Sequence, residues 1–206
     1  MSGVNGSHGA RVALVCGAGR PPGRQIAQGL AAAGWQIAAH DLQPLHLEEL
    51  RAQIEASGSL CRTYVGDSGK GLAARALIED VLNDWGRLDV LIYCLQAAPS
   101  ADLLMLDEWD WQRSLEINLS APFLLAQAAA AVMREQPGGG GIFFVTQPHL
   151  AQFSLALAAA QAGINGLLGA IAAGLLTYNI HSAVFAADQD NFEAIVQQVL
   201  RRIAFS

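Results

Sequence analysis

A glycine-rich turn near the start of the chain could hold a phosphate group. It reads Gly-Ala-Gly-Arg-Pro-Pro-Gly over residues 17–23 and follows an apolar stretch at residues 11–16. A turn of this kind between a strand and a helix presents backbone N–H groups and the positive end of the helix dipole to an anion. The residues of this turn that we expect to contact a dinucleotide cofactor are Gly17, Arg20, Pro22 and Gly23.

An aspartate follows the second apolar stretch, at the distance where a cofactor ribose would lie. Asp41 comes after residues 35–40, and a carboxylate about 20 residues beyond the glycine turn accepts hydrogen bonds from a ribose 2′-OH and repels a 2′-phosphate. Asp41 and its neighbour Leu42 therefore predict binding of NAD(H) in preference to NADP(H). The positive charge of Arg20 favours the opposite preference.

The two prolines of the turn support a second interpretation. Pro21 and Pro22 have no N–H to donate to a phosphate, and Pro21 also excludes the positive φ that a glycine would allow. The glycines would then serve only to pack the first helix against the sheet, and the cofactor would be absent. Both interpretations remain open at the level of the sequence.

The glycine turn and Asp41 would come together in space if strands and helices alternate along the chain. Apolar stretches typical of buried strands occur at residues 11–16, 35–40, 60–65, 88–94, 142–146 and 182–186. Helical stretches lie between and after them, at residues 22–33, 44–57, 70–85, 107–135, 153–178 and 191–203. This alternation predicts an α/β fold with a doubly wound parallel sheet in a three-layer Rossmann-type sandwich. We expect one domain over residues 11–206, preceded by a flexible leader at residues 1–10.

The ordered segments resemble the short-chain dehydrogenase/reductase family over most of the chain. Residues 17–23 resemble the family's Thr-Gly-x-x-x-Gly-x-Gly turn, with Pro21 at its middle glycine. Residues 40–42 resemble the end of the second strand in members that prefer NAD, and residues 157–167 resemble the family's Tyr-Ala-Ala-Ala-Lys helix. The resemblance implies an NAD(P)-dependent oxidoreductase in which Asp67 and Ser68 contact adenine and Asn118 belongs to the catalytic group.

The sequence departs from the family pattern at the catalytic positions. The positions of the family's serine, tyrosine and lysine are occupied by Gln147, Leu157 and Gln161, and its Asn-Asn-Ala-Gly segment reads Tyr-Cys-Leu-Gln at residues 93–96. A positioned acid or base contributes roughly 10²- to 10⁴-fold to a rate, and leucine has no proton to give. With only Asn118 retained, the resemblance implies a degenerate member with impaired or absent catalysis, so whether the chain is an enzyme stays open.

Other residues could in principle replace the missing acid. By chemistry alone the candidates are Tyr93, Thr146, His149 and Tyr178. His149 follows the fifth strand, at the edge where ligands bind in open α/β sheets, although a loop histidine is more often a solvated surface residue. The end of the chain also departs from the family, because Ala187 and Asp188 stand where it has Pro-Gly. We therefore expect a sheet truncated after strand six and an incomplete cover over any substrate.

The charges are distributed unevenly along the sequence. The chain is 52% hydrophobic and 15% charged with a net charge of −6, which excludes a disordered protein and argues against nucleic-acid binding. No Asp, Glu, Lys or Arg occurs from Gln136 to Ala187. Within it, the apolar run from Leu150 to Tyr178 is long enough to span a membrane, but it is interrupted by Gln161 and Asn165 and lacks flanking Lys or Arg and interfacial Trp anchors.

An interface between subunits explains the uncharged run better than a membrane does. Helices 107–135 and 153–178 correspond to those that pair between subunits in the family, and a partner would cover their apolar surfaces. The alternative function is therefore a non-enzymatic assembly subunit that pairs with itself or with an active relative. We expect a homo-oligomer or a hetero-oligomer with a related subunit, and neither a nucleic-acid nor a membrane partner.

The three cysteines have no spacing typical of a disulfide framework or a metal site. Cys16, Cys61 and Cys94 all fall in or beside the expected strands, and no Cys-x-x-Cys pair occurs. Free buried thiols of this kind are typical of a reducing cytoplasm. We therefore expect a cytoplasmic protein without a metal.

Overall fold

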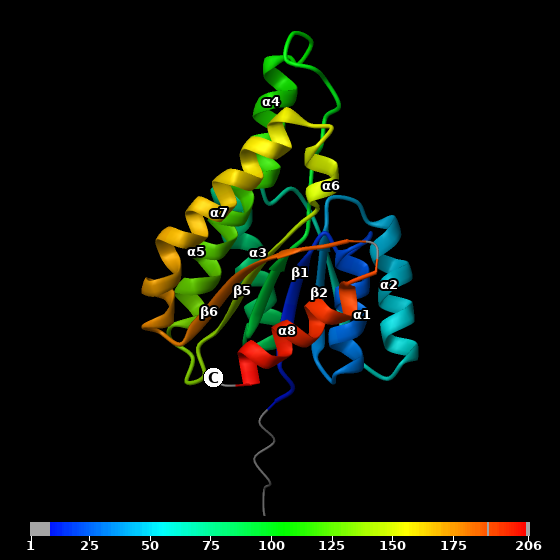
Figure 1. Cartoon of the computed structure of the whole chain (residues 1–206). Helices are drawn as coiled ribbons and strands as arrows, with labels where there is room; N and C mark the ends of the chain where they lie inside the picture. The colour runs from blue at the N-terminus through cyan, green and yellow to red at the C-terminus, as the bar shows by residue number, and fades with distance from the viewer. Residues whose placement is uncertain (1–8, 189, 205–206) are drawn as a thin grey trace, which may run out of the picture.

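The computed structural model describes residues 9–188 and 190–204, and its centre is one parallel sheet (Figure 1). The expected leader lies outside the described residues, apart from Gly9 and Ala10. The strands are β1 (Val12–Cys16), β2 (Gln36–Asp41), β3 (Cys61–Val65), β4 (Val90–Tyr93), β5 (Gly140–Thr146) and β6 (Ile180–Ala186). They pair in the order β3-β2-β1-β4-β5-β6, every pair parallel. This order confirms the doubly wound fold, and its direction reverses between β1 and β4, where such sheets bind ligands.

Helices cover both faces of the sheet and complete three layers (Figure 1). One face is packed by α1 (Gly23–Ala32), α2 (Leu45–Ala56) and α8 (Phe192–Ala204). The other carries α3 (Gly71–Trp85), α5 (Ala121–Met133) and α7 (Leu155–Leu176). The sheet residues are buried on both sides, as in Phe143 toward α8 and Phe144 toward α5. This burial is the reason that the strands read as continuous apolar stretches.

The helix expected at residues 107–135 is not a single α-helix. Asp107 does cap its start, since the Asp107 carboxylate accepts a hydrogen bond from the Asp110 amide at 2.8 Å. The helix is then interrupted by a π-helical turn, η1 (Glu116–Ser120), between α4 (Glu108–Leu115) and α5. A π-helical turn accommodates one extra residue per turn, and the apolar pattern that suggested one helix runs through it unchanged.

The helix expected at residues 153–178 begins later and ends earlier. Its start is set by Ser154, whose hydroxyl accepts a hydrogen bond from the Leu157 amide at 3.4 Å, so α7 begins at Leu155. Phe153 lies outside the helix and is 71% exposed. A separate turn, α6 (Pro148–Ala151), follows β5. A capping hydroxyl competes with the helical backbone bond, and a purely apolar pattern cannot reveal that.

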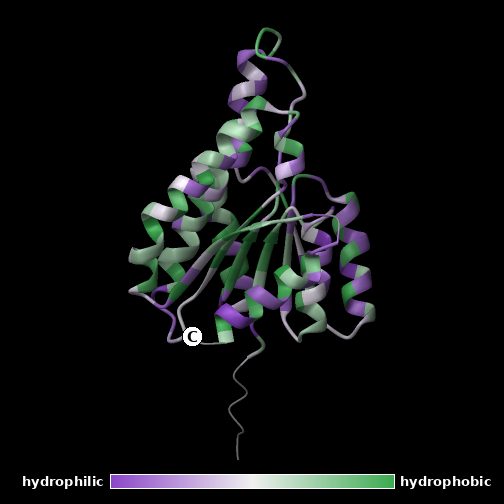
Figure 2. Ribbon diagram, in the orientation of Figure 1, coloured by the Kyte–Doolittle hydropathy of each residue, from purple (hydrophilic) through white to green (hydrophobic). Residues whose placement is uncertain are grey.

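Two helical stretches are apolar enough to span a membrane by length and composition alone. They are Glu108–Met133 and Leu155–Leu176, with 39% and 22% of their most apolar windows buried in the structure. Figure 2 shows apolar residues along the length of both α5 and α7. The buried face of α7 is Ala156, Leu157, Ala160 and Ile164, which leaves most of this helix on the surface.

His40 connects the sheet to the loop that follows β3. Its ring is 2% exposed, and its Nε2 lies 3.0 Å from the carbonyl oxygen of Gly66. Burial lowers the pKa of His40, and the Gly66 hydrogen bond together with the charges of Asp41 and Asp67 oppose this shift without reversing it. The folded protein therefore holds this histidine neutral.

A neutral buried histidine makes stability depend on pH. Because its pKa in the folded state is below the ordinary value of 6.5, its contribution is complete above that pH and is lost as the pH falls through the folded pKa. We predict that His40→Gln, which keeps a donor toward Gly66 but does not titrate, has a flatter decline in unfolding free energy below pH 6.5. Urea denaturation over this range measures it, with the exposed His149→Gln as control. An unchanged decline in His40→Gln would contradict the prediction.

Candidate functional site

The first turn lies directly against the segment that follows β4. A Cβ on Gly17 would stand 2.8 Å from the Leu95 amide nitrogen, and the φ of Gly17 is +86°. A Cβ on Gly23 would collide with the Gly17 carbonyl oxygen. Both positions therefore require glycine for packing alone, so their presence does not by itself indicate a phosphate.

Asp41 holds the turn from the end of β2. Its Oδ2 accepts a hydrogen bond from the Gly19 amide at 3.0 Å, and its Oδ1 accepts one from the Leu42 amide at 2.7 Å. A Cβ on Gly19 would lie 2.9 Å from Oδ2, so the second glycine of the turn makes this contact possible. We did not predict a role for Gly19. The sequence signal that could have indicated it is a second glycine in the turn, two residues after Gly17.

A cleft of about 250 Å³ opens over the carboxyl ends of the central strands, at the switch point between β1 and β4. Four predicted cofactor residues line it together: Gly17, Arg20, Asp41 and Leu42. Pro22 and Gly23 lie behind it as the buried start of α1. The remaining lining residues are Pro21, Gln43, His46, Cys94, Leu95, Gln96, Gln147 and Leu150.

Asp67 and Ser68 lie away from this cleft, in a separate depression between β3 and α3. The Asp67 carboxylate forms an ion pair with Arg113 at 2.8 Å and accepts a hydrogen bond from the Gly69 amide at 2.9 Å. Burial raises the pKa of Asp67, but the Gly69 amide and Arg113 outweigh this and lower it. The carboxylate is thus held as an anion by the protein itself, and it does not line the cleft at the switch point.

Asn118 lies in η1, and its side chain fastens this turn to the segment after β4. Its Nδ2 donates to the Ala97 carbonyl at 2.6 Å and to the Ser114 hydroxyl at 2.9 Å, and its Oδ1 accepts from the Ala97 amide at 3.0 Å. The side chain is 6% exposed. In this structure Asn118 therefore positions the backbone at residue 97.

The family's serine position, Gln147, lines the larger cleft, whereas the other three catalytic positions meet at a small cavity of about 20 Å³. Asn118, Thr146, Leu157 and Gln161 all line it. Leu157 is 1% exposed, and the Gln161 amide reaches the Gln147 carbonyl at 3.4 Å. A volume of this size holds about one water molecule. The fold thus brings these positions together, but with an isobutyl group and neutral amides in place of an acid and a cation.

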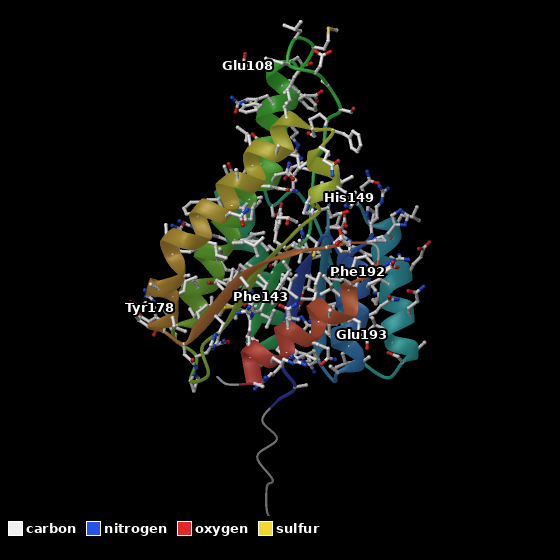
Figure 3. The ribbon with its side chains drawn as sticks, in the orientation of Figure 1. Glu108, Phe143, His149, Tyr178, Phe192 and Glu193 are labelled. Atoms are coloured by element: carbon white, nitrogen blue, oxygen red, sulfur yellow. The ribbon has the colours of Figure 1, made fainter. Side chains whose placement is uncertain are left out.

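Of the four candidate replacement acids, two donate their hydroxyl hydrogen to backbone carbonyls, and the other two do not line the small cavity. The Tyr93 hydroxyl donates to the Ile117 carbonyl at 2.6 Å, and burial raises the pKa of Tyr93 well above its ordinary value. The Thr146 hydroxyl donates to the Phe185 carbonyl at 3.3 Å. His149 lies exposed on α6, and Tyr178 follows the far end of α7, as Figure 3 shows.

The three cysteines are buried and free, as predicted. Burial raises the pKa of Cys61 to about 12, so this thiol is protonated at neutral pH. In the part of the chain that the structure describes, no group of three or more His, Cys, Asp or Glu side chains could hold a metal ion.

Comparison with known sequences places this geometry in a family. The sequence model described as "short chain dehydrogenase" matches residues 11–188. A D-threitol dehydrogenase of Mycolicibacterium smegmatis is 32% identical over 165 residues, which cover 79% of this chain and 64% of the relative. A (3R)-3-hydroxyacyl-CoA dehydrogenase of Mus musculus is 33% identical over 143 residues, covering 66% of this chain and 55% of the relative. The chain thus spans less than two thirds of the length of these two relatives.

Solved structures agree with the sequence comparison. A metagenomic short-chain oxidoreductase in complex with NADP superposes with a TM-score of 0.84 at 26% identity, covering 94% of this chain and 90% of the other. A short chain dehydrogenase from Mycobacterium smegmatis shares the fold with a TM-score of 0.82 at 23% identity, covering 92% and 85%. With the family match over residues 11–188 and the fold it shares with solved members, this chain belongs to the short-chain dehydrogenase family.

Proposed function

We propose that this protein is an oxidoreductase-like member of the family that binds a nicotinamide cofactor but transfers hydride poorly or not at all. The observation that carries the proposal is the burial of Leu157 in a cavity of about 20 Å³, where the family has its proton donor. Gln161 extends the same argument, because a neutral amide neither lowers the pKa of a neighbouring acid nor holds a ribose by charge.

The preference for NAD(H) over NADP(H) rests on Asp41. Its carboxylate lines the cleft, and each oxygen accepts one backbone amide, which leaves lone pairs for ribose hydroxyls. A 2′-phosphate placed there would be repelled by the same charge. Arg20 lies exposed on the same cleft and would attract a 2′-phosphate, so its charge opposes that of Asp41.

We predict that NADH binds more tightly than NADPH, by about tenfold if the repulsion is worth about 1.4 kcal/mol. Fluorescence titration of the reduced cofactor measures both affinities. Gly19→Ala should weaken both, since its Cβ would lie 2.9 Å from the Asp41 Oδ2 and disturb the turn. Gly138→Ala is the matched control, because a Cβ there meets no atom within 4 Å. No fluorescence change with millimolar NADH would contradict cofactor binding.

We predict that the double variant Leu157→Tyr/Gln161→Lys gains no carbonyl reduction over the unmodified protein. The serine position remains Gln147, and a tyrosine ring is larger than the leucine that already fills this small cavity. NADH oxidation with a panel of ketones and aldehydes measures the rate. If the double variant turned over substrate while the unmodified protein did not, the proposal that further catalytic groups are missing would be wrong.

A second candidate function is assembly with another subunit, and the surface of α7 favours it. Small residues recur at every fourth position along the exposed side of this helix: Ala158, Ala162, Gly166, Ala170 and Gly174. Small side chains allow a second helix to approach closely, and the surrounding segment contains no charged residue that such contact would desolvate. A second copy related by a twofold axis would bury this surface, as would a related subunit.

For assembly we predict a dimer or tetramer in solution, measured by light scattering at micromolar concentration. Ala162→Glu should shift the protein toward the monomer, because it places a charge in the middle of the small-residue surface. Ala194→Glu is the control, since Ala194 is exposed on α8 on the opposite side of the sheet. A monodisperse monomer of the unmodified chain would count against the assembly role.

A further inference from the structure

One end of the molecule displays large apolar side chains to solvent. Six of them, which we call the apical surface, are each at least 44% exposed: Leu103, Leu104, Met105, Trp109, Phe153 and Leu155. They come from the loop after β4, from α4 and from the start of α7, and Figure 2 shows the apolar loop beside the hydrophilic start of α4. Three of the six are consecutive in the sequence, and such exposed apolar runs are rare unless a partner covers them.

Hydrogen bonds hold the apical loop in the conformation that exposes these side chains. The Asp102 carboxylate accepts hydrogen bonds from the amides of Leu104 and Met105 at 2.9 and 3.1 Å, and the Asp102 carbonyl accepts one from the Leu106 amide at 3.0 Å. The backbone at residue 97, near the start of the loop, is fastened to η1. The loop is therefore a folded turn, and the exposure of its apolar side chains is part of the fold.

A groove of about 410 Å³ runs along the apical surface. Its walls are residues 100–103 of the loop and residues 151–155 at the start of α7. The described residues 97–109 and 147–155 contain no strand, so a partner cannot extend the sheet at this end. An amphipathic helix suits such a groove, because apolar side chains spaced by three and four residues enter it from one face of the helix.

Carboxylates without compensating cations accompany the apical surface. Asp102, Asp107, Glu108 and Asp110 belong to the same short segment, and Figure 3 shows Glu108 at this end of the molecule. Within residues 9–188 and 190–204, none of the four forms an ion pair. The sequence has no Lys or Arg at residues 88–112, so the apolar side chains lie in a region of negative charge.

This charge distinguishes between the possible occupants of the groove. A second copy related by a twofold axis would bring the same carboxylates against one another. A bilayer surface with anionic lipids would repel them as well. A partner with basic residues beside its apolar ones would neutralise the carboxylates while it covers the apolar side chains.

We propose that the apical surface docks a basic amphipathic helix of a partner protein. The apolar face of that helix enters the groove between Leu103 and Leu155, and its Lys or Arg residues face the carboxylates of the loop and of α4. The groove shares no residue with the cleft at the switch point or with the small-residue surface of α7. The inference therefore does not depend on cofactor binding or on assembly through α7.

Fluorescence anisotropy of two labelled helical peptides with the full chain tests this inference. Each peptide has about 18 residues, roughly five helical turns, with leucine on one face. The opposite face carries lysine in the first peptide and glutamate in the second. We expect saturable binding of the leucine/lysine peptide at micromolar concentration, weakened when the salt is raised to about 0.3 M, and no binding of the leucine/glutamate peptide.

The apolar contact is tested by Leu104→Ser/Met105→Ser, which removes two exposed side chains of the turn. This double variant should weaken the leucine/lysine peptide by about tenfold or more. Leu60→Ser/Leu72→Ser is the matched control, because both leucines are exposed away from the apical surface, and its affinity should be unchanged.

The charge contact is tested by Glu108→Gln/Asp110→Asn, which should weaken the leucine/lysine peptide and flatten the dependence of its affinity on salt. Glu79→Gln/Asp80→Asn on α3 makes the same change of net charge at exposed positions elsewhere, and it should leave both unchanged. Thermal unfolding of each variant confirms that it remains folded.

The proposal would be overturned if the unmodified protein failed to bind the leucine/lysine peptide, or bound both peptides equally. It would also be wrong if phosphatidylcholine vesicles carried the unmodified protein but not Leu104→Ser/Met105→Ser in flotation, since a lipid surface would then be the occupant. A shift from oligomer to monomer in that variant, measured by light scattering, would instead assign the apical surface to a second copy of this chain. None of these results would affect the proposed cofactor site.

Discussion

The close approach between the first turn and the end of β4 constrains everything else in the site. Gly17 and Leu95 meet at a distance that leaves no space for a side chain on the turn. This contact joins the two halves of the sheet at the switch point, where the strand order reverses. The turn, the acid at Asp41 and the segment at Leu95 and Gln96 are consequently parts of one rigid edge.

On the β1–β2 side of this edge, packing and ligand recognition demand the same residues. Gly17 is required because the segment after β4 lies against it, and Gly23 because it packs on the Gly17 carbonyl oxygen. Gly19 is required because the Asp41 carboxylate reaches its amide. The turn is therefore preserved by the needs of folding even where a cofactor is not used. The shape of this turn would therefore be the same with or without a cofactor.

On the β4–β5 side, an apolar side chain and neutral amides pack at the positions that correspond to the family's catalytic residues. Leu157 fills the acid's position, Gln161 contacts the Gln147 backbone, and Gln96 bonds to β5. Asn118 remains, with its side chain fully occupied by the backbone at residue 97 and by Ser114. The absence of charge from Gln136 to Ala187 fits this pattern, since a buried cation without a catalytic partner would carry an uncompensated desolvation cost.

The sequence by itself determined the fold, because apolar strands alternating with helices admit few arrangements and the glycines and Asp41 mark the first turn. It also showed that Leu157 and Gln161 stand at the family's tyrosine and lysine positions, since residue type and spacing are enough to recognise such a replacement. Only the tertiary structure decided that the helix around Asn118 is interrupted, because the Asn118 side chain bonds the backbone of Ala97, 21 residues earlier in the chain. Only the structure showed that Asp67 pairs with Arg113 and that Gln96 bonds the Val145 carbonyl of β5, because a side chain's direction is set by partners that sequence spacing does not specify.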